Sequence, residues 1–332
     1  MGSFGKFVRA AFVAAFATSL AAGASERAFA ADQPLRIGYS DWPGYVAWQV
    51  ALKKGWFKDA GVDVDFEWFD YSASLDAFGA GKLDAVFTTN GDTLVMGSGG
   101  TKGVMVMLTD YSSGNDMIVG KSGLKTLKDL KGKKVALEKG LVEHLLLLNG
   151  MKKEGVDEND ITIVNVKTND TPQVLSDPTV SAIGAWQPIS GQAMRASPGA
   201  RPLYTSADQP GLIYDVLTVS PSNFAARKAD YAKLLKVWAK VVAFINDPAT
   251  QPEAVKIMAA RSGVPPEQYI HYLKGTALLS PTAGVKVFQD ADGFGSLYGS
   301  SRYADAFNLK AGVYKTSLNV KSYIDPSIAK EP

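Results

Sequence analysis

The chain has 332 residues, and its 35 basic and 33 acidic side chains give a formal net charge of +2. This near balance argues against a broad basic face for nucleic acid or an anionic membrane. The sequence contains no cysteine, which excludes disulfide bonds and a lipid-bearing cysteine, and its 46% of hydrophobic residues is typical of a globular protein with a large core.

The segment 1–30 has the pattern of a secretory signal peptide. Lys6 and Arg9 precede an apolar stretch at 10–23, and Ala28-Phe29-Ala30 forms an A-x-A cleavage site. The apolar stretch, at about 14 residues, is too short to cross a bilayer as a helix. We therefore expect the segment to be removed on export and the protein to work in the periplasm.

Residues 36–66 predict one βαβ unit. A strand at 36–39 leads into a Pro-Gly loop, a helix with apolar residues at helical spacing ends at Gly55, and residues 62–66 alternate as a second strand. The loop follows the carboxyl end of the first strand, which is where open α/β sheets bind ligands.

Short apolar strands then alternate with helices up to about residue 219. We expect strands at 85–89, 104–108, 117–119, 135–137, 161–166, 182–186 and 216–219. Helices are expected at 46–54, 74–80, 143–154 and 171–177, and a helical tail at 231–245, 253–260 and 266–273. Alternating strands and helices predict an α/β fold with mostly parallel sheets.

Several phrases of the sequence resemble one family. They are Lys54-Gly55-Trp56-Phe57 followed by Gly61, Gly81-Lys82-Leu83-Asp84-Ala85, and the segment 127–135. In this order they resemble extracytoplasmic solute-binding proteins of ABC importers, in the NMT1-like branch that serves nitrate, aliphatic sulfonates, taurine and thiamine-pyrimidine precursors. The resemblance covers roughly residues 34–219.

The resemblance implies a two-lobe periplasmic binding protein of the type II kind, with each lobe a mostly parallel sheet flanked by helices. Two hinge strands would join the lobes. Lobe one is expected at 33–115 plus 217–332, and lobe two at 116–216. It also implies a monomer that binds a small solute and delivers it to an ABC permease and its ATPase.

Loops at the predicted strand ends supply the candidate ligand-binding residues: Asp41, Trp42, Tyr45, Asn90, Asp92, Asp116, Glu138, Glu143, Trp186 and Asp215. Six of them are acidic, and Lys139 is the one basic residue among these loops. Buried carboxylates need cations or hydrogen-bond donors. A planar guanidinium would satisfy them through paired N–H donors, and the aromatic residues could stack on it. We therefore expect a guanidine-like solute.

The loop before His144 also favours a cation. In sulfonate and nitrate members of the family, this loop tends to carry small hydroxyl residues, which hold an oxyanion at a helix N-terminus. Here it reads Leu141-Val142-Glu143, which places a carboxylate at that position. An oxyanion such as nitrate, a sulfonate or taurine, or a thiamine-pyrimidine precursor, remains an alternative solute, and a sensing module for a membrane receptor remains an alternative function.

Several of these residues could instead have a purely structural role. Asp92 and Glu143 could cap helices, Asp41 could set a turn, and Trp186 could belong to the core of lobe two. Catalysis is not expected, because the sequence lacks G-x-S-x-G and H-E-x-x-H motifs and contains only two histidines. We expect a binding protein without a metal or cofactor.

Overall fold

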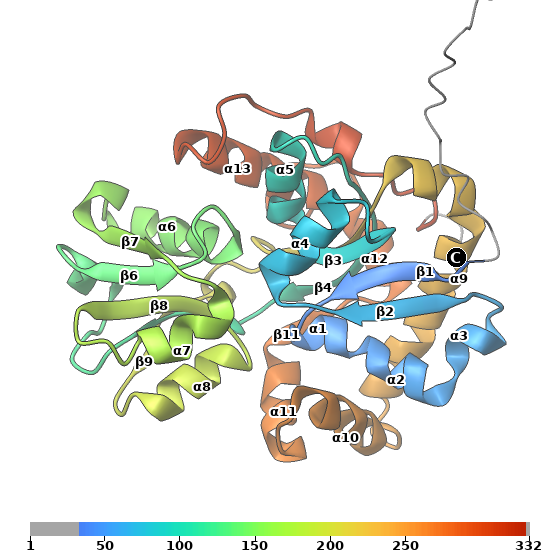
Figure 1. Cartoon of the computed structure of the whole chain (residues 1–332), viewed down its shortest axis with the longest axis horizontal. Helices are drawn as coiled ribbons and strands as arrows, with labels where there is room; N and C mark the ends of the chain where they lie inside the picture. The colour runs from blue at the N-terminus through green and yellow to red at the C-terminus, as the bar shows by residue number, and fades with distance from the viewer. Residues whose placement is uncertain (1–32, 330–332) are drawn as a thin grey trace, which may run out of the picture.

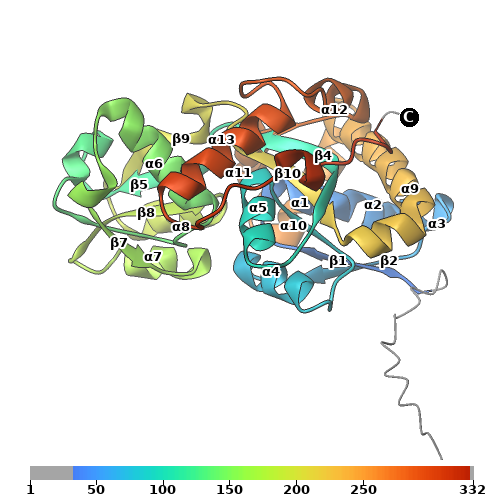
Figure 2. The same cartoon turned by 90° about the horizontal axis from the view of Figure 1, so that it is seen from above.

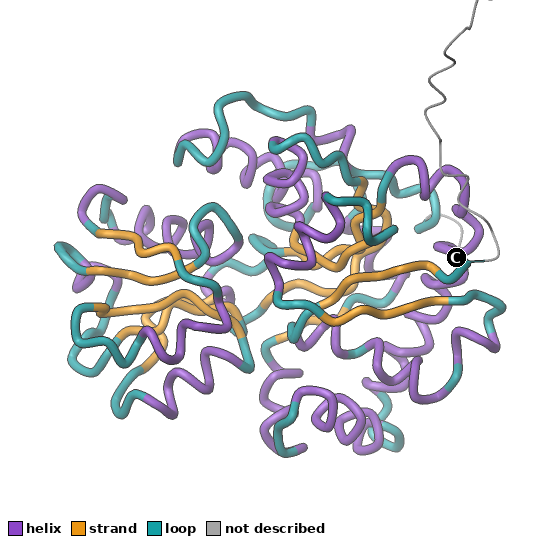
Figure 3. The backbone as a smooth tube through the Cα atoms, in the orientation of Figure 1, coloured by secondary structure: helices purple, strands orange, loops and turns teal. Residues whose placement is uncertain are grey.

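The computed structural model describes residues 33–329, whose strands form a six-stranded and a five-stranded sheet, each flanked by helices (Figure 1). The tube drawn in Figure 3 shows the two groups of strands separated and joined by loops. The predicted two-lobe α/β fold is confirmed. The predicted signal peptide lies outside the described residues. Within those residues, no helix is long and apolar enough to cross a membrane.

The first lobe contains the six-stranded sheet in the order β11-β4-β10-β3-β1-β2. Its strands are β1 (Leu35–Tyr39), β2 (Val64–Trp68), β3 (Ala85–Thr89), β4 (Val104–Ser112), β10 (Tyr214–Val219) and β11 (Thr276–Leu278). The helices of this lobe are α1 (Pro43–Val46), α2 (Trp48–Lys54), α3 (Trp56–Asp59), α4 (Tyr71–Gly79), α5 (Asn90–Ser98), α9 (Pro221–Asn246), α10 (Gln251–Ser262), α11 (Pro266–Lys274), α12 (Pro281–Val287) and α13 (Leu297–Lys310).

The second lobe contains the five-stranded sheet in the order β7-β6-β8-β5-β9. Its strands are β5 (Asp116–Gly120), β6 (Lys134–Leu137), β7 (Thr162–Asn165), β8 (Val180–Trp186) and β9 (Arg201–Thr205). Its helices are α6 (Val142–Glu154), α7 (Thr171–Val174) and α8 (Ile189–Ala196).

The strands that follow the two crossings between the lobes run against their neighbours. β5 is antiparallel to β8 and β9, and β10 is antiparallel to β3 and β4. The remaining pairs are parallel apart from β11 with β4. The prediction of mostly parallel sheets was therefore wrong: both sheets are mixed, because the strands β5 and β10, which follow the crossings, pair antiparallel with their neighbours.

The strand pairing locates the two places where the chain passes from one sheet to the other. β4 ends at Ser112 in the first sheet and β5 begins at Asp116 in the second, so the proposed boundary at 115/116 falls between them. The return crossing lies between β9 and β10, and Tyr214 already pairs with β4. The proposed boundary at 216/217 falls inside β10, so we propose 206–213 as the return segment instead.

The core of the first lobe is aromatic. The rings of Trp48 and Trp238 stack with centroids 4.9 Å apart, and Phe87 of the central strand β3 lies 5.7 Å from Trp48. Both tryptophans are fully buried. This packing joins α2 and α9 to the sheet, so the loops at the strand ends extend from a rigid support.

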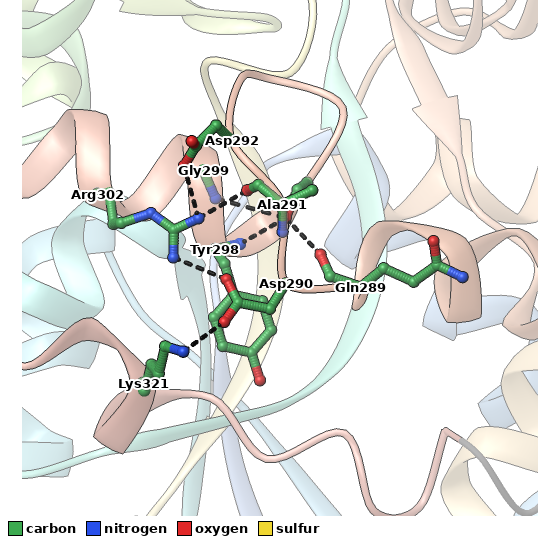
Figure 4. A network of polar contacts seen from close by, with 9 residues as sticks. Gln289, Asp290, Ala291, Asp292, Tyr298, Gly299, Arg302 and Lys321 are labelled. Atoms are coloured by element: carbon green, nitrogen blue, oxygen red, sulfur yellow. Dashed lines mark hydrogen bonds and ion pairs between the residues drawn. The ribbon is translucent and has the colours of Figure 1, made fainter.

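Helix α13 lies beside the junction of the lobes when the molecule is seen from above (Figure 2). Its Arg302 is held by ion pairs with Asp290 and Asp292 at 2.8 and 3.0 Å, and Lys321 binds the other oxygen of Asp290 (Figure 4). Tyr303 of the same helix donates to Oδ1 of Asn149 on α6, 2.7 Å away. The helix therefore links the two lobes.

Sequence patterns missed the elements that depend most on tertiary packing. β11 has three residues and is stabilised by pairing with β4, and β9 is the edge strand of its sheet. The start of α5, Asn90-Gly91-Asp92, consists of poor helix formers. Helix α9 begins at Pro221, ten residues before the expected start at Tyr231, with a break at Arg227 where φ is −125°.

Candidate functional site

A small cavity lies between the lobes. It is lined by Trp42, Tyr45, Tyr71, Thr89, Asp116, Val142, Trp186, Ile213 and Asp215. The cavity volume open to the centre of a water molecule is ≈ 10 Å³. This is about the room that one water molecule needs. The cavity therefore has room for about one water molecule, and a larger ligand requires the walls to move apart.

Two aromatic residues of the first lobe donate to carboxylates at the cavity. Trp42 Nε1 lies 2.9 Å from Asp110 Oδ1, and Tyr45 Oη lies 2.5 Å from Asp215 Oδ1. Each carboxylate thereby uses one oxygen to position a ring. The loop after β1 brings both rings to the sheet, since Trp42 and Tyr45 flank the first turn of α1.

The other two aromatic residues make a second pair of such contacts. Tyr71 Oη donates to Asp92 Oδ2 over 2.6 Å, and Trp186 Nε1 donates to Asp41 Oδ1 over 2.9 Å. The last bond joins the two lobes. The rings of Tyr71 and Trp186 meet edge to face with centroids 5.2 Å apart. Aromatic rings thus face the cavity from both lobes.

Asp110 is a site residue that the sequence analysis missed. It is fully buried on β4, directly opposite Asp215 of β10 in the register of the antiparallel pair. A Cβ on Gly44 would lie 2.0 Å from Asp110 Oδ2, so only glycine leaves room for this carboxyl group. The available signal was an acid two residues beyond the predicted strand 104–108. Tyr71 was missed because the loop after β2 was not considered.

Buried carboxylate oxygens around the cavity have no hydrogen-bond partner other than a neighbouring carboxyl group, which is Asp215 for Asp110 and Glu143 for Asp116. They are Asp110 Oδ2, Asp116 Oδ2, both oxygens of Glu143, and Asp215 Oδ2. These residues are at most 3% exposed. No lysine or arginine is among the residues that line the cavity. Because an isolated buried carboxylate is costly, each of these groups needs a proton or a cationic partner.

Burial is the main cause of raised pKa values at this site. It raises the pKa of Asp110 and Asp92 to about 7, and that of Asp116 and Asp41 to about 6. The pKa of Glu143 and of Asp215 lies well above the usual range, because burial is reinforced by a neighbouring carboxylate, Asp116 for Glu143 and Asp110 for Asp215. The site therefore retains protons near neutral pH.

The N-terminus of α6 already faces a carboxylate. Leu141 is the N-cap residue, and no side chain caps the helix, so Glu143 is not a cap. The backbone N–H of Val142 instead interacts with Asp92 and lowers the pKa of that group against the effect of burial. On α5 the cap is Thr89, whose Oγ1 accepts from Asp92 N. Neither acid has the capping role that the sequence left open.

Five candidates are absent from the cavity lining: Asp41, Asn90, Asp92, Glu138 and Glu143. Of these, Asn90 and Glu138 bind side chains away from the cavity. Asn90 Nδ2 donates to the hydroxyl oxygens of Ser300 and Ser301, and its Oδ1 accepts from Tyr214 N, so its amide braces α13 against β10. Glu138 accepts from Ser72 Oγ at 2.8 Å and from Thr168 Oγ1 at 3.1 Å, which joins the lobes at the rim of the site. Both side chains are positioned to support the site from outside.

The carboxyl groups do not gather as metal ligands. Among the described residues, no group of three or more His, Cys, Asp or Glu side chains could hold a metal ion. The acids instead lie around the cavity together with the aromatic rings of Trp42, Tyr45, Tyr71 and Trp186.

The chain belongs to the NMT1/THI5-like family, whose sequence model matches residues 42–263. The predicted family is therefore confirmed. Among curated relatives, an inferred binding protein of Brucella abortus (strain 2308) is 26% identical over 303 residues, covering 89% of this chain and 91% of that protein. An inferred aliphatic sulfonates-binding protein of Bacillus subtilis (strain 168) is 27% identical, covering 58% of this chain and 60% of that one.

Solved structures show the same fold. The alkanesulfonate-binding protein SsuA of Xanthomonas axonopodis pv. citri, bound to MOPS, superposes with a TM-score of 0.72 at 18% identity, covering 88% of this chain and 98% of that one. The periplasmic nitrate-binding protein NrtA of Synechocystis PCC 6803 gives a TM-score of 0.70 at 12% identity, covering 90% of this chain and 87% of that one. At these identities the likeness establishes the fold.

Proposed function

We propose that this protein is the periplasmic solute-binding component of an ABC importer and that it captures a small planar cation with several N–H donors, of which guanidinium is the simplest. The observation that carries the proposal is the set of buried carboxyl groups of Asp110, Asp116, Glu143 and Asp215, which have oxygens without an N–H or hydroxyl donor beside a cavity walled by aromatic rings. The transport role draws on the family and on the names of its relatives.

Guanidinium matches this site in charge and in shape. Its N–H groups form a planar fork that pairs with carboxylates through two parallel hydrogen bonds. The acids lie on strands and helices of both lobes, so donors that point in different directions can reach several of them. The flat faces of the ion can lie against Trp42 or Trp186, where a cation is attracted to the ring.

Capture between the lobes suits delivery to a permease. Contacts such as Trp186 with Asp41 and Ser72 with Glu138 exist only when the lobes are together. A ligand that binds both lobes therefore favours the closed form, which differs in surface from the open one. A permease with its ATPase would recognise the closed form. In the alternative function as a sensing module, a membrane receptor would recognise the same closed form.

An oxyanion is the second candidate, because the relatives are named for sulfonates and nitrate. An anion in this cavity would face unpartnered carboxylates and no basic side chain of the lining. It could bind only if several acids were protonated at once. The thiamine-pyrimidine alternative has a relative in an inferred thiamine biosynthesis protein of Haemophilus influenzae, 29% identical over 152 residues, covering 44% of this chain and 48% of that one. An aminopyrimidine also offers donors, but it needs a larger expansion of the cavity than guanidinium does.

Three small molecules of one shape test the proposal. Guanidinium, urea and nitrate are planar and trigonal, and they differ mainly in charge, which is positive, neutral and negative. Thermal unfolding at pH 7.5 should show stabilisation by guanidinium alone, since a ligand at a hundredfold excess over Kd adds about 2.7 kcal/mol. Methylguanidine, agmatine, an aminopyrimidine, taurine and an alkanesulfonate extend the panel. Stabilisation by nitrate or a sulfonate without guanidinium would overturn the cation.

A further inference from the structure

The carboxyl groups at the cavity form two facing pairs. Asp110 and Asp215 are register partners on β4 and β10, so their side chains project from the same face at adjacent positions. Asp116 at the start of β5 and Glu143 in the first turn of α6 form the second pair, in which the two carboxyl groups interact directly. Each pair contains buried oxygens without an N–H or hydroxyl donor. Two ionised carboxylates this close repel each other, so a pair keeps one proton unless a cation compensates it.

We infer, on the basis of the proposed function, that this protein binds its cation in exchange for protons: the pairs Asp110–Asp215 and Asp116–Glu143 each hold a proton when the cation is absent, and at least one proton leaves to solvent when it enters. The exchange balances charge, because one positive ion replaces another at the same oxygens.

The surroundings of the pairs provide no other source of positive charge. Among the described residues, the groups that face them are acids, phenols and neutral donors: Asp92, Glu138, Tyr45, Tyr71, Tyr269, Trp42, Ser112 and Thr109. Lys167 acts on Glu138 at the rim. The raised pKa values of Asp110, to about 7, and of Asp116, to about 6, place the release of protons in a range that is easily reached in solution.

The pairs also sit where the lobes meet. Asp110 and Asp116 flank the first crossing, and Asp215 follows the second. The Asp110–Asp215 pair belongs to the first lobe and the Asp116–Glu143 pair to the second, and Asp116 and Asp215 act on each other electrostatically. Loss of protons without a cation therefore pushes the lobes apart, whereas protons or a cation allow them to close.

Calorimetric titration with guanidinium chloride, with ionic strength held by KCl, tests the exchange. At one pH near 5.5, the binding enthalpy should depend on the ionisation enthalpy of the buffer, with about one proton released per ligand. The Kd should fall about tenfold per pH unit between pH 5 and pH 6.5 and then level off, which is the linkage expected for one released proton. A Kd that is constant over this range, with a buffer-independent enthalpy, would overturn the exchange and leave the cation site standing.

Ligand-free protein gives a second readout that does not need binding. The folded pKa of Asp110 lies above its unfolded value, so its stabilising effect is complete below about pH 4 and is lost as the pH rises through about 7. The thermal midpoint should therefore fall from pH 5 to pH 8. Asp110→Asn and Asp116→Asn should flatten this fall, and Asp76→Asn, which removes an exposed acid on α4, should not.

The binding calorimetry and the thermal unfolding of ligand-free protein together distinguish the possible results. A falling midpoint together with proton release on binding supports the exchange. A midpoint that does not fall, or that falls equally in the site variants and in Asp76→Asn, means that the pairs hold no protons and overturns the inference even if guanidinium binds. A falling midpoint without binding of guanidinium or any other cation of the panel refutes the proposed function, and the exchange with it.

Discussion

Trp186 of the second lobe donates its indole N–H to Asp41 of the first lobe over 2.9 Å, so this hydrogen bond forms only when the lobes are closed. Trp186 also lines the cavity and packs edge to face on Tyr71. Trp186 thus both lines the cavity and forms a hydrogen bond between the lobes that enclose it. Under the proposed function, we expect Trp186 to couple binding to closure.

Trp186→Phe should weaken ligand binding while it preserves an aromatic wall. Loss of the donor leaves Asp41 without its partner, and the expected cost is about 0.5–1.5 kcal/mol, which is roughly a twofold to tenfold rise in Kd. Titration calorimetry measures it. Trp56→Phe is the matched control, because Trp56 packs on Phe244 far from the cavity. Equal Kd values in both variants would remove Trp186 from the closing contacts.

Glu143→Gln should lower affinity for guanidinium without unfolding the protein. Both oxygens of Glu143 are buried and have no N–H or hydroxyl donor, so the proposed ligand would supply the donors that its neighbour Asp116 does not. Hydrogen bonds to charged groups contribute about 1.5–3 kcal/mol, so the Kd should rise at least tenfold. Because a raised pKa makes an ionised Glu143 costly, the ligand-free variant should be as stable as the parent protein at pH 8. Unchanged affinity would place Glu143 outside the site.

Gly44→Ala should abolish high-affinity binding. The added methyl group would lie 2.0 Å from Asp110 Oδ2 and 2.5 Å from Asp110 Cγ, so the carboxyl group has to move. A substitution that overpacks a buried position typically costs about 1–3 kcal/mol. The control is Gly295→Ala, since a Cβ at Gly295 meets nothing within 4 Å. If Gly44→Ala binds like the parent protein, the position of Asp110 does not matter for the ligand.

Tyr303→Phe should weaken binding without weakening the first lobe. Its hydroxyl reaches Asn149 across the lobes over 2.7 Å, and the bond is expected to contribute about 0.5–1.5 kcal/mol to closure. Tyr314→Phe is a useful contrast, because Tyr314 binds Asp305 within one lobe at 2.9 Å. It should lower the thermal midpoint and leave the Kd unchanged. If Tyr303→Phe left the Kd unchanged and Tyr314→Phe raised it, α13 would not hold the lobes together.

Asn90→Ala should reduce stability rather than affinity. It removes an amide that binds Ser300, Ser301 and the backbone of Tyr214, and leaves buried polar groups unpaired at a cost of about 1–3 kcal/mol. Unfolding by heat, compared with the Kd for guanidinium in the same preparation, separates the two effects. A large loss of affinity at normal stability would return Asn90 to the list of ligand contacts.

Local patterns in the sequence predicted much of the fold. The strand at Ala85–Thr89 coincides with β3, and the expected helix at 143–154 begins one residue after the start of α6 and ends with it at Glu154. These elements are read from apolar periodicity and from residues such as Gly155, whose φ of 70° ends α6. Periodicity is a property of neighbouring residues, so it needs no knowledge of the distant chain.

The candidate site could be predicted only in part. Asp116 and Asp215 were found because each lies beside an apolar strand near an expected crossing, and both line the cavity. Asn90 was chosen by the same reasoning, yet it faces α13. Which way a strand-end residue points depends on the helix or loop that packs against it. That information is not in the neighbouring sequence.

The sequence by itself determined the alternation of strands and helices, the family, and the excess of acids in the loops at the strand ends. Tertiary structure alone decided that Asp110 lies opposite Asp215 and that Glu143 faces Asp116. Residues 110 and 215 are far apart in the chain, and their meeting depends on the antiparallel register of β4 and β10 after the chain has crossed between the lobes twice. Whether a carboxylate is left without a partner is set by such long-range packing, which is why the local pattern indicated acids but not their pairs.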